Sequence, residues 1–275
     1  MRPRLEDFYA ETLAALLDRG LLRRDDEVLV VCAGERDCEV FRRAEFRRVT
    51  ISNLDTRMRG DEFAPYRWSR QDVENLTLPD GSYDWVVVHS GLHHCYSPHR
   101  GLLEMYRVAR RGVLVFEPRD SLLVRLGVRL SFGQEYEVAA VVGNDLKFGG
   151  VGNTAIPNYV YRWTEREVEK TVRSAAPLGV PKVHYFYALR VPAARLEGMR
   201  NRAAAALKLL LPLLRVFTAL FPRQCNNFAF AVEKLQLPRD LHPWLQWENG
   251  APALNQKWIE ARYDQQRLKR AAQDE

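Results

Sequence analysis

The stretch "YDWVVVHSGLHHCYSPHRGLLEMYRVARRGVLVFEP", residues 83–118, contains two apolar runs separated by a segment with helical periodicity. The runs at 83–90 and 112–118 are continuous rather than alternating, which is typical of strands buried on both faces of a sheet. Residues 99–110 place apolar side chains at helical spacing between them. Strand, helix and strand in this order form the parallel unit of an α/β fold. We therefore expect a mostly parallel sheet with helices on both faces.

The segments on either side continue this alternation. A helix is expected at 4–19, and the motif "TEREVEKTVRSAA" predicts another at 164–176, with Thr164 and Glu167 as a capping box. Further strands are expected from their apolar or aromatic runs, and a charged helix start follows the first of them. These strands are "EVLVVC" at 27–32, "RRVTISNLD" at 47–55, "APYRWSRQD" at 64–72, "KVHYFYALRV" at 182–191 and "NNFAFAVEK" at 226–234.

Two segments interrupt the pattern, and a tail follows it. Residues 119–160 are mixed and rich in glycine, as expected of a lid or of a surface insertion. An apolar insertion at 193–223 contains a helix that Pro212 is expected to break. We predict one domain over residues 1–235 that includes both insertions, and a C-terminal extension over 236–275.

The composition favours a large globular domain. The chain has 275 residues, of which 47% are hydrophobic and 28% charged, a balance that allows a sizeable core. Lysine and arginine outnumber aspartate and glutamate by 41 to 35, without a long basic run. Because no basic motif interleaved with aromatic residues is present, we expect no nucleic-acid partner. The N-terminal apolar stretch contains acidic residues, unlike a secretory signal, so we expect a cytoplasmic protein.

The first strand and the turn after it resemble a nucleotide-binding unit. Ala33 and Gly34 are small enough to let a ligand approach the backbone, and the helix start at Glu35 offers amide groups to an anion. Asp55, after the second strand, is placed to accept hydrogen bonds from two ribose hydroxyls. These features fit NAD and S-adenosylmethionine equally, and they also fit an ordinary tight turn.

The block "DVENLTLPDGSYDWVVVHSGLHH" favours one of these cofactors. Asp72 could accept a hydrogen bond from an adenine amine, and Val73 offers its amide. The block and the helix and strand after it resemble the class I S-adenosylmethionine-dependent methyltransferases. The resemblance implies a Rossmann-like, seven-stranded sheet whose strand at 226–234 is antiparallel and pairs with 182–191. It implies methyl transfer to a small-molecule substrate, at oxygen or nitrogen. The expected cofactor-binding residues are Ala33, Gly34, Glu35, Leu54, Asp55, Asp72, Val73, His89 and Ser90.

The first strand departs from the family pattern. Cys32 stands where these enzymes usually have an acid, and the turn has one glycine where they have several. Glu35 or Asp37 would have to compensate. The alternative is therefore a methyltransferase-like binding or scaffold subunit without catalysis. A nicotinamide-dependent oxidoreductase is disfavoured, because it would need more glycines in this turn.

Two adjacent histidines follow the strand at 83–90. Because substrate would approach there, His93 and His94 are candidate general bases for an oxygen acceptor. Otherwise they are polar loop residues. With Cys95 they suggest a metal site, but adjacent side chains rarely point at one ion, and the four cysteines match no zinc framework. We therefore expect no metal. Glu117, at the end of the next strand, is expected to face the same pocket.

The apolar helix at 203–221 is nearly long enough to span a bilayer, but Lys208, Pro212 and Arg215 interrupt it. Arginines flank it, so one interpretation is peripheral contact with an anionic membrane. The favoured interpretation is a helix of the core or of a homodimer interface.

Overall fold

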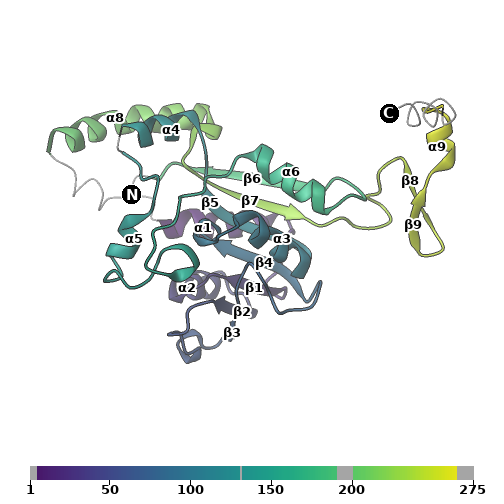
Figure 1. Cartoon of the computed structure of the whole chain (residues 1–275), viewed down its shortest axis with the longest axis horizontal. Helices are drawn as coiled ribbons and strands as arrows, with labels where there is room; N and C mark the ends of the chain where they lie inside the picture. The colour runs from purple at the N-terminus through teal and green to yellow at the C-terminus, as the bar shows by residue number, and fades with distance from the viewer. Residues whose placement is uncertain (1–4, 131, 191–200, 265–275) are drawn as a thin grey trace.

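The computed structural model describes residues 5–130, 132–190 and 201–264. Its centre is a seven-stranded sheet in the order β3-β2-β1-β4-β5-β7-β6 (Figure 1). All strand pairs are parallel except those made by β7, which runs antiparallel to both β5 and β6. The predicted Rossmann-like sheet and the predicted pairing of its last two strands are confirmed. The strands are β1 (Glu27–Val31), β2 (Arg48–Asn53), β3 (Arg67–Arg70), β4 (Tyr83–His89), β5 (Ala109–Pro118), β6 (Lys182–Ala188) and β7 (Asn227–Glu233).

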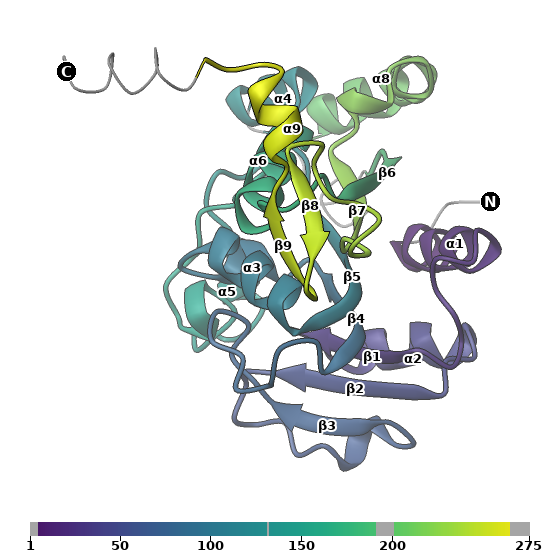
Figure 2. The ribbon, with the colours of Figure 1, turned by 90° about the vertical axis from the view of Figure 1, so that its right-hand side faces the viewer.

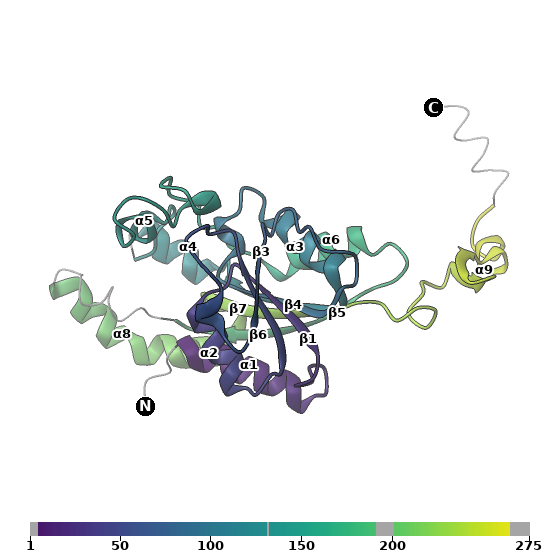
Figure 3. The ribbon, with the colours of Figure 1, turned by 90° about the horizontal axis from the view of Figure 1, so that it is seen from below.

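Helices cover both faces of the sheet (Figure 3). Helices α1 (Leu5–Asp18) and α2 (Glu35–Arg43) pack on one face, and α3 (Pro98–Val108) and α6 (Glu165–Ala175) on the other. Side chains of one strand alternate between the two cores, so Val28 and Val30 meet α1 and α2 while Leu29 and Val31 meet α3 and α6. This burial on both faces explains the unbroken apolar runs of the strands.

Local signals set the helix boundaries. Ser97 caps α3 by accepting a hydrogen bond from the Arg100 amide, and Thr164 and Glu167 form the predicted capping box of α6. The expected continuation of the 99–110 helix to residue 110 was wrong, because β5 begins at Ala109. Arg110 and Arg111 give the start of this strand a polar sequence that resembles the end of a helix. In the structure they form ion pairs with Asp84 and Asp26 at the end of the sheet.

The insertion at 119–160 contains two short helices, α4 (Leu122–Arg129) and α5 (Val138–Val142), and the 3-10 turn η3 (Val151–Asn153). Its two ends are fastened to each other, since Trp163 donates its backbone amide to Pro118 and Asp120 donates to Trp163. The buried Arg119 side chain forms an ion pair with Glu165, at 2.8 Å between Nη2 and Oε2. The insertion is thus held at its base by the sheet and α6.

Helix α8 (Asn201–Leu220) continues through Pro212, so the predicted break was wrong. Residues 193–200 of the predicted apolar insertion lie outside the described residues. From Leu209 onward many apolar side chains of α8 are exposed, and Leu209 is 79% accessible, so this helix is not part of the described core. An exposed apolar face is typical of contact with another protein or a membrane surface. Among the described residues, none of the helices has the length and apolar character that a bilayer crossing requires.

Beyond β7 the chain leaves the sheet. A hairpin of β8 (Leu245–Glu248) and β9 (Ala251–Leu254), followed by α9 (Gln256–Glu260), lies beyond the end of the sheet (Figures 1 and 2). Trp244 stacks on His242, with 4.0 Å between ring centroids, and contacts Trp258 of α9. The division into a domain at 1–235 and an extension at 236–275 stays a prediction.

Candidate active site

A cavity of about 320 Å³ lies where the parallel strands end. Cys32 follows β1, Asn53 ends β2, and Ser90 follows β4. The strand order reverses between β1 and β4, and ligands of open α/β sheets bind at this switch point. The lining residues are Cys32, Asn53, Leu54, Gln71, Asp72, Val73, Glu74, Ser90, Gly91, His94, Cys95, Tyr96, Gly149, Gly150, Gly152 and Asn153.

The chain leaves β1 and β4 in an unusual conformation. Cys32 and Ser90 have φ values of 52° and 55°, in the left-handed region that non-glycine residues rarely adopt. A Cβ atom on Gly91 would overlap the side chain of Cys32. Glycine at position 91 is therefore required for the two turns to pass each other at the floor of the cavity.

The segment after β3 forms one wall of the cavity. Asp72 accepts a hydrogen bond from the amide of Glu74 at 2.9 Å, which fixes the turn. The carboxylate of Glu74 accepts from the amides of Tyr96 and Ser97 at 2.9 and 2.8 Å. These bonds join this wall to the loop after β4, so the two walls form one connected frame.

Asp55 does not line the cavity. Its carboxylate forms an ion pair with Arg57 and accepts hydrogen bonds from the backbone amide and Nε of that residue, at 2.9 and 2.8 Å. Hydrogen bonding by Arg57 lowers the pKa of Asp55. The Arg57 guanidinium lies 3.0 Å from the ring centroid of Phe148 in the insertion. The role of Asp55 as a ribose ligand stays a prediction. At the end of β2, the residues that line the cavity are Asn53 and Leu54.

The first turn lies outside the lining as well. Its Gly34 amide donates to the buried carboxylate of Asp37 at 3.0 Å. Burial raises the pKa of Asp37 to about 6. His89, also outside the lining, stacks on Tyr9 of α1 with 4.7 Å between ring centroids, and burial lowers its pKa to about 3.

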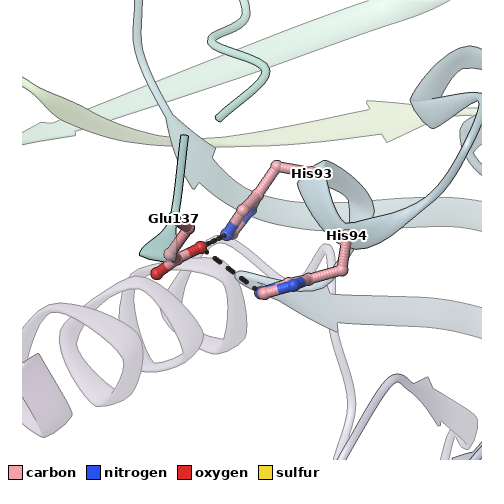
Figure 4. Close-up of side chains that lie close together, drawn as sticks. All are labelled: His93, His94 and Glu137. Carbon is pink, nitrogen blue, oxygen red and sulfur yellow. Dashed lines mark ion pairs between the residues drawn. The ribbon is translucent and has the colours of Figure 1, made fainter. Parts of the chain in front are cut away.

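A cluster of two histidines and two glutamates lies next to the cavity, and Figure 4 shows three of its members, His93, His94 and Glu137. His93 and His94 belong to the turn η2 (Leu92–His94). His93 Nδ1 lies 2.6 Å from Glu117 Oε2, and the Leu92 amide donates to Glu117 Oε1 at 2.7 Å. On the other side, Glu137 Oε2 lies 3.3 Å from His93 Nε2 and 3.6 Å from His94 Nε2. Glu117 comes from the end of β5 and Glu137 from the insertion.

The two histidines differ in charge state. Burial alone would lower the pKa of His93, but the carboxylates of Glu117 and Glu137 outweigh it and raise that pKa to about 10. The neighbouring His93 ring in turn lowers the pKa of Glu137 to about 2. For His94, burial and the charge of His93 lower the pKa. At neutral pH His93 is therefore a cation, and His94 is the histidine that can accept a proton.

Part of the chain matches a known protein family. Residues 30–116, which run from β1 to β5, match the family model described as a methyltransferase domain. This segment is therefore similar to a methyltransferase domain. It contains the strand ends that line the cavity and both histidines of the cluster. No curated protein matched the sequence of the chain.

Solved structures resemble the chain only loosely. The YcgJ protein from Bacillus subtilis is 12% identical, covering 82% of this chain and 99% of its own, with a TM-score of 0.48. Magnesium protoporphyrin IX methyltransferase from Synechocystis, solved with bound S-adenosylhomocysteine, is 13% identical, with 84% and 83% coverage and a TM-score of 0.48. A Burkholderia thailandensis 1,6-didemethyltoxoflavin-N1-methyltransferase is 16% identical, with 82% and 78% coverage and a TM-score of 0.46. These likenesses indicate nothing about the substrate of this chain.

The structure brings together part of the predicted site. The cavity lining includes Leu54, Asp72, Val73, Ser90 and His94. The other predicted residues lie outside it: Ala33, Gly34, Glu35, Asp55, His89 and His93. Glu117 contacts His93 and does not line the cavity. Sequence reasoning missed Asn53, although it ends a predicted strand, and it missed Glu137, for which no local motif gives a signal.

Proposed function

We propose that this methyltransferase domain transfers a methyl group from S-adenosylmethionine to a small-molecule acceptor, at oxygen or nitrogen. The observation that carries the proposal is the cavity at the carboxyl ends of β1, β2 and β4, at the switch point of the sheet. Its volume of about 320 Å³ is within the usual range of small-ligand sites.

The proposed cofactor lies along the strand ends. The adenine lies against Asp72 and Val73, where a carboxylate can accept from its amine and an amide can donate to a ring nitrogen. The ribose lies near Asn53 and Leu54. The methionine end faces the turn at Ser90, beside Cys32. We expect the polar groups in this lining to pair with those of an adenosine, while Cys32 stands where these enzymes usually have an acid.

The proposed acceptor approaches from the His94 side of the cavity. Its nucleophilic atom attacks the sulfonium methyl in line, and the charge is dispersed in the transition state. The protein then acts mainly by positioning, which can contribute about 7–11 kcal/mol. His94 is the proposed proton acceptor because its pKa is lowered. His93, which is protonated and buried, is a positioning residue that holds Glu137 and the turn.

Calorimetry with S-adenosylmethionine and S-adenosylhomocysteine tests the proposal. We expect both to bind, and we expect Asp72→Asn to weaken binding by about 1–3 kcal/mol through loss of the charged acceptor. Asparagine at position 72 can still accept from the Glu74 amide, so the turn is preserved. The matched control is Asp61→Asn, because Asp61 is exposed and is not one of the lining residues.

A specific observation favours one alternative. The Asp55 carboxylate forms an ion pair with Arg57, and Cys32 stands where these methyltransferases usually have an acid. Both features would be expected of a scaffold subunit that has lost the methyl-donor site. If neither ligand binds the full-length wild-type protein, the scaffold interpretation replaces the enzyme.

A further inference from the structure

Three potential metal ligands meet at the wall of the proposed acceptor site. The free carboxylate oxygen or ring nitrogen atoms of His93, His94 and Glu137 all lie within 4.8 Å of one another. Figure 4 shows one carboxylate oxygen of Glu137 facing a nitrogen of each imidazole ring. We propose that His93 Nε2, His94 Nε2 and Glu137 Oε2 bind a divalent transition-metal ion, with Zn²⁺ as the best match, and that the open coordination position takes an oxygen of the acceptor.

The distances fit an ion better than direct hydrogen bonds. Zn–N and Zn–O bonds of about 2.0–2.2 Å in a tetrahedral site separate neighbouring ligand atoms by about 3.3–3.6 Å. The two nitrogens lie 3.3 and 3.6 Å from Glu137 Oε2. Glu137 Oε2 is buried and has no hydrogen-bond partner of good distance and angle among the described residues, so its contacts with the two nitrogens are ion pairs. A hydrogen bond requires the donor, its hydrogen and the acceptor to lie nearly in line. Two ligands of a tetrahedral metal ion instead point at the ion from different directions.

The surroundings of the ligands are those of a metal site. Glu117 holds Nδ1 of His93 at 2.6 Å, which orients the ring and directs Nε2 toward Glu137. A carboxylate behind a ligating histidine is the common second-shell arrangement. Glu117 is itself fixed by the Leu92 amide.

The insertion supplies the third ligand from a rigid position. The Glu137 amide donates to the Asn158 carbonyl, and Val160 donates to Glu135, so a short antiparallel bridge holds this segment. The Asn158 side chain donates to the His93 carbonyl at 2.9 Å and ties the bridge to the turn of the histidines. The ligand set is therefore assembled by tertiary contacts between two distant segments.

The chemistry of the donors indicates the class of ion. Two imidazoles and one carboxylate suit zinc and related first-row ions, and they are poor ligands for Mg²⁺ or Ca²⁺. Catalytic zinc sites have three protein ligands and one open position. The side chain of His94 lines the cavity, so the open position can be reached from the proposed acceptor site. A bound ion would polarise an acceptor hydroxyl and lower its pKa.

The role of the ion toward the acceptor rests on the proposed function, but ion binding does not. Binding of the ion would displace the proton from His93 Nε2, because a ligating imidazole is neutral. With the ion bound, His94 would be a ligand instead of the proton acceptor, and the ion would lower the pKa of the acceptor hydroxyl, whose proton would pass to water. The acceptor class is then a compound with a hydroxyl, phenol or similar oxygen donor beside the methylated position.

Cobalt titration of the full-length protein tests the site, because Co²⁺ in a tetrahedral site of this kind has a visible absorption band. We expect saturable binding of one Co²⁺ per chain, with displacement by Zn²⁺. Glu117→Gln should weaken binding about 10–100-fold, the usual cost of a second-shell change. His94→Ala and Glu137→Gln should weaken it more than Glu117→Gln does. The matched controls are His184→Ala and Glu233→Gln, which break a histidine–glutamate pair of 2.8 Å on β6 and β7 without touching the cluster.

Two results would overturn the proposal. One is a wild-type protein that shows no tetrahedral Co²⁺ spectrum. The other is binding that survives both His94→Ala and Glu137→Gln, in variants whose circular dichroism shows that they are folded. S-adenosylhomocysteine calorimetry on the same samples separates the two hypotheses. Metal binding without binding of this ligand supports the ion site and contradicts the proposed function.

Discussion

At the scale of single residues, Asp37 is a buried acid whose ionisation opposes folding. It is 8% exposed and caps the start of α2 by accepting from the Gly34 amide. Burial raises its pKa from 3.8 to about 6. The folded state therefore holds the proton more tightly than the unfolded state. This favourable contribution is complete below pH 3.8 and is lost as the pH rises through about 6.

We expect Asp37→Asn to stabilise the protein above pH 6, because it removes the ionisation of a buried group while keeping an oxygen that can accept from Gly34. A shift of about two units corresponds to at most about 3 kcal/mol. Urea unfolding of the wild type and the Asp37→Asn variant between pH 4 and 8 measures this difference in the free energy of unfolding. The two stability curves should diverge as the pH rises, and parallel curves would show that Asp37 titrates normally in the folded state.

At the scale of elements, the start of α6 was predicted from four residues. Thr164 accepts from the Glu167 amide at 3.2 Å, and Glu167 accepts from the Thr164 amide at 2.8 Å. We expect Thr164→Ala to lower the free energy of unfolding by about 1 kcal/mol, through loss of the cap. The control is Thr171→Ala, which places a better helix former within α6 and should be neutral or slightly stabilising. Equal effects of the two changes in thermal unfolding would contradict a capping role.

The sequence predicted the elements whose signals are local. Unbroken apolar runs identified the central strands, because both faces of this sheet are covered by helices. The junction between α3 and β5 was missed, because the arginines that pair with Asp84 and Asp26 give the strand start a polar, helix-like sequence. Helix α8 is continuous despite Pro212, and the freed carbonyl of an exposed helix can be solvated by water.

The site was predictable only where it follows from strand ends. Asp72, Val73 and Ser90 line the cavity because they come just after parallel strands, a rule that needs no tertiary information. The same rule placed Asp55 in the site, but it could not foresee that Arg57, two residues on, would hold the carboxylate. Glu137 lies 43 positions after His94 in the sequence and contacts it in the structure. The backbone bridge that places Glu137 there has no local sequence pattern that would predict it.

At the scale of the whole molecule, the insertion at 119–160 joins both ends of the proposed site. Near one end, Gly149, Gly150 and Asn153 complete the cavity lining, and the Phe148 ring lies against Arg57. At the other, Glu137 reaches the histidine cluster. The base of the insertion is fastened to the sheet, so its far part can act as a lid over a fixed frame.

We expect Phe148→Ala to loosen this lid, because it removes the cation–π contact with Arg57. A contact of this kind contributes about 0.5–1 kcal/mol when partly exposed, or roughly a two- to fivefold change in an equilibrium. Hydrogen exchange measured by mass spectrometry should show faster exchange at 148–153 in the variant, and S-adenosylhomocysteine should bind more weakly by a similar factor. Ile156→Ala is the control, since Ile156 lies in the same insertion with a side chain that is 63% exposed. If exchange at 148–153 were the same in the wild type and the Phe148 variant, the aromatic contact would not hold the insertion closed, and closure would have to depend on the bridge at Glu137 instead.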